Sequence, residues 1–460
     1  MSNKEVFIKE SKRVAFDLNH RKTIRFNISK YDAAVAVGKQ RYSDLDLAKE
    51  KAAEIKSHVI THLDEYLEIF EKNAKRNGIE VLWAKDANET LKHISEIVHQ
   101  HEAKLVVKSK SMTTEEVELN EHLEKENVES VETDLGEYIV QIAGEKPYHI
   151  VTPAMHKSKE DIATLFHEKH GTPEHSSPEF LTNFVRETLR EKFCNADVGV
   201  TGANFIVADA GGIALTENEG NGVMTMAFPK THVVIAGIEK VIPSYRDLAH
   251  FWPLLAAHGT GQQITVYNSL ITGPKKSDEV DGPERMVVIL MDNGRTDLLE
   301  SDKQFEALKC IRCGACLNSC PIYKNIGGYT YDATYSGPIG SVITPFYKGF
   351  KDYNHLSFAC SVCGKCSEVC PVKIPLHDLL LLNRSKAVEE GNSPLSWTLA
   401  MKGMELIMGK RALMDLSGGG MKNLGLQMVP HIAGEDKSLP PIAKESFSKQ
   451  WKRNRNKNKS

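Results

Sequence analysis

The chain has 460 residues and a mass of 51.3 kDa, a length that predicts two or three domains. Hydrophobic residues make up 41% and charged residues 26%, which is typical of a globular protein with a substantial core. Lysine and arginine total 58 against 61 acidic residues, and the net charge of −3 excludes a generally basic nucleic-acid binder. The first residues lack the apolar core of a secretory signal, and no segment has the composition of a membrane span. We therefore expect a cytoplasmic protein without a transmembrane segment.

Alternating strand and helix patterns occupy the first two thirds of the chain. After an N-terminal extension, residues 1–43, the spacing of apolar residues predicts one or two helices over residues 43–77. Strand patterns then alternate with helical ones, which predicts an α/β domain over residues 44–293 with a largely parallel sheet. The predicted strands are 80–84, 103–108, 137–142, 149–152, 198–208, 213–216, 232–237, 263–267 and 286–291, and the predicted helices are 114–126, 157–169 and 178–193.

Two basic residues lie where one predicted strand leads into a helix. Residues 108–116 read Lys-Ser-Lys-Ser-Met-Thr-Thr-Glu-Glu, in which Thr113 and Glu116 fit a capping box. Ligands of open α/β sheets gather where strands end, and a helix N-terminus attracts anions. Lys108 and Lys110 are therefore candidate catalytic or anion-binding residues. The alternative is a capped helix with surface lysines.

A glycine-containing turn followed by two acids forms a second candidate site. Residues 209–221 contain Gly211 and Gly212, which permit a tight turn, and then Glu217 and Glu219, which could act as base or nucleophile. The alternative is a hairpin with exposed acids. The lone Cys194, which follows a helix rich in arginine and lysine, is expected to be a small buried apolar residue.

The other eight cysteines form two runs, each with the spacing C-x2-C-x2-C-x3-C-P. This density argues against disulfides in a protein without a secretory signal, and the three successive steps of three fit a four-cysteine zinc site poorly. The spacing is that of bacterial ferredoxins, which predicts two [4Fe–4S] clusters in a domain over residues 300–385. The runs comprise Cys310, Cys313, Cys316 and Cys320, and Cys360, Cys363, Cys366 and Cys370.

In two-cluster proteins the cysteine before proline ligates the other cluster. The first cluster is therefore assigned to Cys310, Cys313, Cys316 and Cys370, and the second to Cys360, Cys363, Cys366 and Cys320. Gly314 and Gly364 stand where each loop must bend. The charges of Arg312, Lys365 and Lys373 could raise the cluster potentials, although each could equally be a solvated side chain.

The end of the chain, residues 386–460, is predicted to be a helical and basic tail. Residues 449–460 carry six lysines or arginines and no acid, and we expect this last stretch to be disordered.

Both halves together resemble the lactate utilization protein B family of bacterial L-lactate oxidation. The resemblance runs through most of the chain and both cysteine runs match in full. It rests on Lys-Ser-Lys-Ser-Met-Thr-Thr-Glu-Glu at 108–116, Glu-Thr-Asp-Leu-Gly-Glu at 132–137, Val-Thr-Gly-Ala-Asn-Phe-Ile-Val at 200–207, Gly-Ile-Ala-Leu-Thr-Glu-Asn-Glu-Gly at 212–220, Ile-Arg-Cys-Gly-Ala-Cys-Leu-Asn at 311–318 and Ser-Gly-Pro-Ile-Gly at 336–340.

The resemblance implies a fold of three parts: an α/β domain with a sheet like that of CoA transferases and sugar-phosphate isomerases, a small mainly α ferredoxin-type dicluster domain, and a helical C-terminal tail. In CoA transferases the catalytic glutamate precedes Asn-Gly. Here Glu217-Asn218 is followed by Glu219, so acyl transfer is not expected.

The implied role is that of an iron–sulfur electron-transfer component in a multi-subunit system that oxidises L-lactate to pyruvate. The implied partners are a cysteine-rich iron–sulfur subunit, since this chain has no adjacent Cys-Cys pair, and a smaller subunit with a lactate-utilization domain. Two alternatives stay open: the α/β domain itself binds and oxidises a small organic anion, or the protein is a redox sensor.

Overall fold

A computed structural model describes residues 1–392, 395–415, 418–427 and 440–457. It divides into two compact units, Met1–Arg384 and Ser385–Ser460. Within the described residues, no helix combines the length and apolarity needed to cross a bilayer.

Four helices precede the first strand. The predicted extension forms α1 (Asn3–Phe16) and α2 (Leu18–Lys39), which begin at the capping side chains of Ser2 and Asp17. The predicted helices at 43–77 are confirmed as α3 (Leu45–Thr61) and α4 (Leu63–Arg76). α2 packs against α12 (Leu248–Gly259), and α1 packs against α15 (Tyr323–Ile326), so the N-terminal helices contact both the α/β and the cysteine-rich regions.

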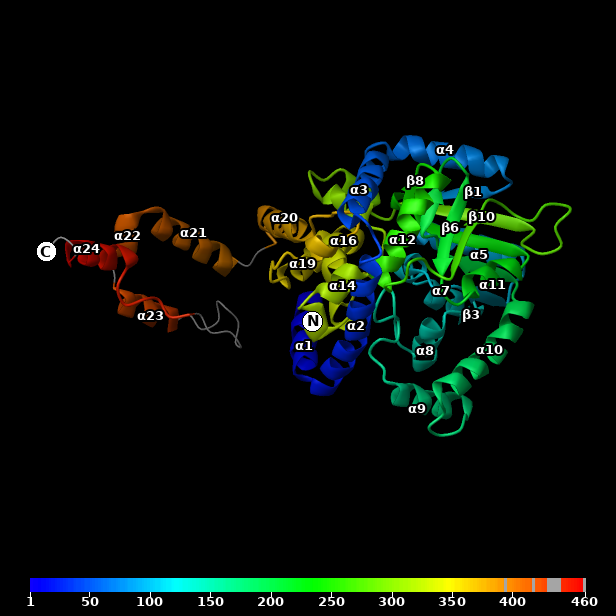
Figure 1. Cartoon of the computed structure of the whole chain (residues 1–460), viewed down its shortest axis with the longest axis horizontal. Coiled ribbons are helices and arrows are strands. Elements are labelled where there is room, and N and C mark those ends of the chain that lie inside the picture. The colour runs from blue at the N-terminus through cyan, green and yellow to red at the C-terminus, as the bar shows by residue number, and fades with distance from the viewer. Residues whose placement is uncertain (393–394, 416–417, 428–439, 458–460) are drawn as a thin grey trace. The chain divides into compact units, whose positions relative to one another are not determined.

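A six-stranded sheet forms the centre of the α/β domain, with the order β1-β10-β7-β4-β2-β3 (Figure 1). Every neighbouring pair is parallel, which confirms the predicted parallel α/β fold. The carboxyl ends of all six strands therefore meet at one edge, where α/β proteins bind ligands. The strands are β1 (Glu80–Ala84), β2 (Leu105–Lys108), β3 (Glu129–Glu132), β4 (Val198–Thr201), β7 (Thr231–Gly237) and β10 (Arg285–Met291).

Helices cover both faces of this sheet, because successive residues of a strand point to opposite faces. Val106 of β2 packs into a core with α5 (Ala87–Gln100) and α7 (Leu119–Lys125). The next residue, Val107, packs into a separate core with helices α8 (Leu135–Ala143), α9 (Lys159–His170) and α10 (Pro178–Asn195).

Four other strands form a second sheet, in the order β8-β5-β6-β9. The turn between β5 and β6 passes through Gly211, whose φ is +56° and whose Cα lies so close to α4 that a Cβ would be 2.3 Å from the carbonyl carbon of Asn73. Only glycine fits this turn. The elements are β5 (Phe205–Val207), β6 (Gly212–Glu217), β8 (Val241–Ile242), β9 (Tyr267–Ile271) and the helix α11 (Asn221–Ala227).

Short helices build the cysteine-rich region, in agreement with the predicted mainly α domain. Of these, α14 and α19 each lie within one cysteine run and pack against each other. The helices are α13 (Arg295–Leu299), α14 (Ala315–Ser319), α16 (Gly337–Lys348), α17 (Phe350–Tyr353), α18 (His355–Phe358), α19 (Lys365–Val369) and α20 (Leu376–Glu389), with 3₁₀ helices at Gln304–Lys309 and Tyr329–Tyr331. Two further 3₁₀ helices, Ile238–Lys240 and Tyr245–Asp247, belong to the α/β domain.

Helices also form the described part of the C-terminal unit. They are α21 (Leu395–Gly409), α22 (Arg411–Asp415), α23 (Gly419–Gln427) and α24 (Phe447–Lys457). The expected disorder of residues 449–460 is therefore wrong for 449–457, which belong to α24, and residues 458–460 lie outside the described residues.

Several strand predictions are wrong. Residues 137–142 form helix α8, because Asp134 caps its start by accepting from the Glu137 N–H and Gly144 ends it in the left-handed region. Residues 149–152 form no strand, since the His149 ring accepts the N–H groups of Val151 and Thr152. The strand expected at 263–267 begins only at 267, and residues 198–208 form two strands, β4 and β5.

The structure differs from the sequence predictions at two further places. Strand β3 was not anticipated because its sequence, Glu-Ser-Val-Glu, has little apolar character. Cys194 is exposed rather than buried, because the core-facing residues of α10 are Leu181, Val185, Leu189 and Phe193.

Candidate functional site

A cavity of about 410 Å³ lies at the carboxyl edge of the main sheet. Residues from the two predicted candidate segments, Lys110 and Glu217, line it together although they are far apart in the sequence. Arg312 and Cys313 of the first cysteine run line the same cavity. The structure thus brings the α/β domain and the cysteine-rich region together around one space.

Lys108 does not line this cavity. Its side chain is fully buried, and Nζ lies 2.8 Å from Glu115 Oε1 and 2.6 Å from Glu132 Oε1. Burial by itself lowers the pKa of Lys108, but the two carboxylates outweigh it and raise the pKa above its ordinary value. Burial also raises the pKa of the neighbouring Glu137. Lys108 is therefore a buried counter-ion, neither a surface lysine nor a cavity residue.

The helix after Lys108 begins differently from the prediction. Ser111, not Thr113, is the N-cap of α6 (Met112–Glu116), and its hydroxyl accepts from the Thr114 N–H at 3.3 Å. Glu116 does not cap this helix, and its carboxylate pairs with Arg295 instead.

Two acids of the second candidate segment face the cavity. The carboxylate of Glu217 accepts from the N–H groups of Gly222 and Val223 at 2.7 and 2.9 Å, and burial raises its pKa. Glu219 accepts from the Leu135 N–H at 3.1 Å. Glu219 is an exposed residue, and partial desolvation of its carboxyl group, followed by the negative charge of Asp134, raises its pKa.

Two lysines supply positive charge to the cavity wall. Lys110 donates to the carbonyl of Val151, and Lys240 donates to the carbonyl of Ala203 at 2.7 Å. Burial lowers the pKa of Lys240 to about 8. Lys240 was not predicted, because its position depends on the end of β7 lying beside β4 in the sheet.

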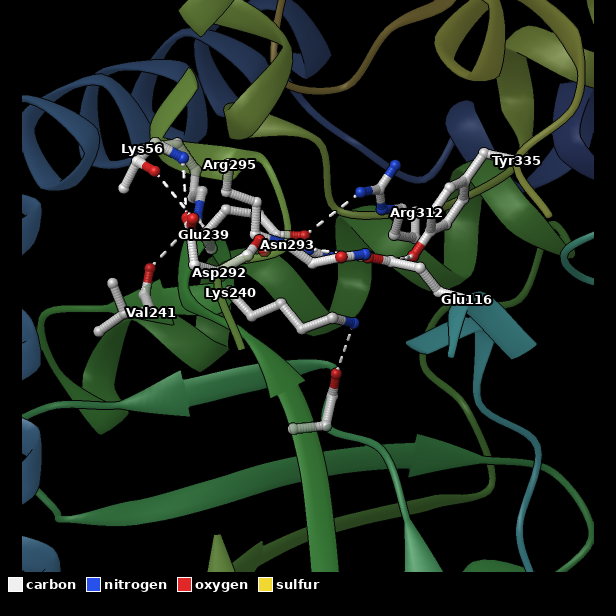
Figure 2. Close-up of polar contacts among 12 residues, drawn as sticks. Lys56, Glu116, Glu239, Lys240, Val241, Asp292, Asn293, Arg295, Arg312 and Tyr335 are labelled. Atoms are coloured by element: carbon white, nitrogen blue, oxygen red, sulfur yellow. Dashed lines mark hydrogen bonds and ion pairs between the residues drawn. The ribbon is translucent and has the colours of Figure 1, made fainter. Parts of the chain in front are cut away.

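A buried charge network connects the sheet edge to the first cysteine run (Figure 2). Arg295 donates from both Nη atoms to the two oxygens of Glu116, each at 2.9 Å, and from Nε to Glu239. Glu239 also accepts from Arg312 Nη2 at 3.2 Å. The Tyr335 hydroxyl donates to Glu116 at 2.6 Å, and the Arg312 guanidinium lies 4.3 Å from the centre of the Tyr335 ring.

Glu239 is the centre of this network. Burial raises its pKa, but Arg295 and Arg312 outweigh burial and hold the pKa at about 2. The backbone carbonyl of Glu239 also accepts from the buried Lys56 at 2.5 Å. The carboxylate is therefore charged at all ordinary pH values, and it fixes Arg312 beside Cys310 and Cys313.

The two cysteine runs have the same local backbone structure. Gly314 and Gly364 both have φ of +76°, and Arg312 and Val362 have φ of +59° and +55°. In each run the N–H two residues after the first cysteine donates to its sulfur, at 3.4 Å for Cys310 and 3.2 Å for Cys360. The last cysteines also accept: Cys320 from the Tyr323 N–H at 3.5 Å and Cys370 from the Ile374 N–H at 3.4 Å.

The thiols influence one another across the two runs. Burial raises the pKa of Cys316 well above its ordinary value, and charge on Cys310, Cys313 and Cys370 raises it further. In the other group, burial raises the pKa of Cys366 to about 12, and charge on Cys360 and Cys320 adds to this increase. Each group therefore contains the last cysteine of the opposite run.

The surroundings of the cysteines suit a bound cluster. Buried thiols with raised pKa values need a bound cation to become thiolates, and backbone N–H donors to sulfur are a known means of tuning clusters.

Of the three basic residues expected near the clusters, only Arg312 points into the protein. Lys373 pairs with Asp46 and Glu50 at 3.1 and 2.8 Å, and Lys365 pairs with Glu368 at 2.8 Å, all partly exposed.

The sequence is similar to those of characterised families over both regions. The LUD domain family matches residues 67–291, and the 4Fe-4S dicluster domain family matches residues 306–374. Lactate utilization protein B of Bacillus subtilis (strain 168) is 46% identical over 355 residues, which are 77% of this chain and 74% of that protein. The chain belongs to the lactate utilization protein B family.

Other members of the lactate utilization protein B family show the same extent of similarity. The protein of that name from Bacillus cereus (strain AH820) is 43% identical over 397 residues, 86% of this chain and 83% of that one. A crystal structure of a duf162 family protein from Deinococcus radiodurans aligns with a TM-score of 0.27 at 15% identity, covering 50% of this chain and 98% of that chain.

Proposed function

We propose that this protein is the iron–sulfur electron-transfer component of a multi-subunit system that oxidises L-lactate to pyruvate. Its relatives are named for lactate utilization, and one of its two regions is of the 4Fe-4S dicluster family. The proposed partners are a cysteine-rich iron–sulfur subunit and a smaller subunit with a lactate-utilization domain.

One observation carries the proposal: the thiols form two groups that each include the last cysteine of the opposite run, and Cys363 is the exposed member of its group. Cys310, Cys313, Cys316 and Cys370 would hold one [4Fe–4S] cluster, and Cys320, Cys360, Cys363 and Cys366 the other. Bound clusters would each carry one electron at a time, and the conversion of lactate to pyruvate releases two electrons and two protons.

The chain itself contributes position and charge to this role. The main contribution comes from Arg312, which Glu239 and Tyr335 hold beside the first run. A fixed positive charge next to a cluster favours its reduced, more negative form. The buried network therefore supports electron acceptance at the end of the run nearest the α/β domain.

The test is complementation of a deletion strain. Wild-type protein is expected to restore L-lactate oxidation in extracts, and Cys313→Ser is expected to fail. Cys194→Ser is the matched control, because Cys194 is exposed and outside both runs. If the deletion strain oxidises lactate at the wild-type rate, or if Cys313→Ser restores it fully, the proposal is wrong.

A further inference from the structure

We propose that the cavity at the carboxyl edge of the sheet binds a small 2-hydroxy- or 2-oxo-carboxylate, represented by L-lactate and pyruvate. The inference rests on the proposed function, which supplies the reaction, and it adds the place where the reacting molecule binds. The wall of the cavity contains three cations, three acids and a cysteine: Lys110, Lys240 and Arg312; Asp134, Glu217 and Glu219; and Cys313. A ligand there would lie between the α/β domain and the first cysteine run.

The ammonium groups of Lys110 and Lys240 have unused N–H donors. An ammonium group has three N–H donors, and the hydrogen bonds of Lys110 and Lys240 within the protein are each to a single backbone carbonyl. In Figure 2 the Lys240 side chain extends away from Glu239 toward this acceptor, at 2.7 Å. Charge-assisted hydrogen bonds from such donors are the usual means of holding a carboxylate.

Two residues that line the cavity each have a buried polar atom without a hydrogen-bond partner among the described residues. These atoms are the hydroxyl of Ser109, a residue only 3% exposed, and Nη1 of Arg312. Buried polar groups are normally hydrogen-bonded, so these two residues keep unused hydrogen-bonding capacity beside the cavity. A carboxylate with a second oxygen on the adjacent carbon supplies both a charged and a neutral partner.

The size of the cavity also suits a small ligand. Its wall carries both signs of charge, so a ligand with one carboxylate would place that group beside Lys110 and Lys240. The volume of about 410 Å³ lies in the range of roughly 300–1,000 Å³ that is common for small-molecule sites.

The experiment is isothermal titration calorimetry of L-lactate and pyruvate into the full chain, purified without oxygen, at pH 8. Lys110→Ala and Lys240→Ala are expected to weaken binding at least tenfold. Glu219→Gln is expected to tighten it several-fold, because this change removes negative charge from the wall, and a misfolded variant would not bind more tightly. Lys159→Ala, on the exposed start of α9, is the control and should bind as the wild type does.

Binding of neither acid by the wild type would overturn the inference, as would unchanged affinity in all three cavity variants. Acetate lacks the second oxygen and is expected to bind more weakly, so equal affinity for acetate would overturn the assigned ligand class. These results are separate from the complementation test: if Cys313→Ser fails to restore lactate oxidation while the chain binds no lactate, the electron-transfer role stands and the binding site does not.

Discussion

Arg312 lies between two predicted cluster ligands in the sequence, yet its guanidinium donates to Glu239 of the α/β domain, with Nη2 3.2 Å from Oε1. Glu239 follows β7 and is 1% exposed, so this contact is shielded from water. The loop that carries Cys310 and Cys313 is thereby attached to the functional edge of the sheet through one buried carboxylate.

Glu239→Gln is expected to destabilise the protein strongly. The change leaves Arg295 and Arg312 buried without their shared counter-charge, and breaking a buried pair in this way typically costs about 3–5 kcal/mol. Glu80→Gln is the matched control, since Glu80 also binds an arginine, Arg285, but is 44% exposed. Its loss should stay below about 1 kcal/mol. Urea unfolding measures both, and equal losses would show that the network does not hold the structure together.

The two lysines of the 108–110 segment are expected to behave differently. Lys108→Met leaves Glu115 and Glu132 without their buried counter-ion and should lower the free energy of unfolding by about 3–5 kcal/mol. Lys110→Met removes a half-buried side chain with one hydrogen bond and should cost about 1 kcal/mol or less. Chemical denaturation of the two variants checks this order, and a stable Lys108→Met would contradict the assigned role of Lys108.

The paired glycines of the cysteine runs offer a comparison within one molecule. Gly314→Ala and Gly364→Ala each place a side chain at φ of +76°, which costs roughly 1–2 kcal/mol. A Cβ at Gly314 would also lie 2.8 Å from Val151 Cγ2, whereas a Cβ at Gly364 meets no heavy atom within 4 Å. We therefore expect Gly314→Ala to lose more thermal stability and more bound iron. A greater loss in Gly364→Ala would argue against the described packing.

A pH dependence is expected from His232. Its side chain is fully buried, Nε2 lies 2.8 Å from Thr201 Oγ1, and burial lowers the pKa to about 3. In the unfolded chain the pKa is about 6.5. Below that value the unfolded state gains a proton that the folded state cannot accept, so the stabilisation is present above pH 6.5 and is lost as the pH falls.

Between pH 7.5 and pH 6.0 this effect should cost roughly 0.8 kcal/mol. The control is His232→Gln, which does not titrate, and the quantity measured is the difference in unfolding free energy between the two proteins at each pH. A difference that does not change with pH would show that His232 titrates normally in the folded protein.

The sequence allowed the parallel α/β fold and the cysteine runs to be predicted, because strand periodicity and ligand spacing are local features. It did not allow the role of Lys108 to be predicted, because Glu132, its counter-ion, comes from a neighbouring strand in a polar segment that did not look like a strand. The Glu116–Arg295–Glu239 network was missed for the same reason: its members are separated by more than 50 residues and meet only when the sheet forms. Helix α8 was mistaken for a strand because Tyr-Ile-Val is common in both.

The central claim is that eight cysteines hold two [4Fe–4S] clusters, and metal and sulfide analysis of the chain purified without oxygen tests it most directly. The account predicts a brown protein with about eight irons and about eight sulfides per chain. A colourless protein that contains zinc, or that lacks inorganic sulfide, would contradict it.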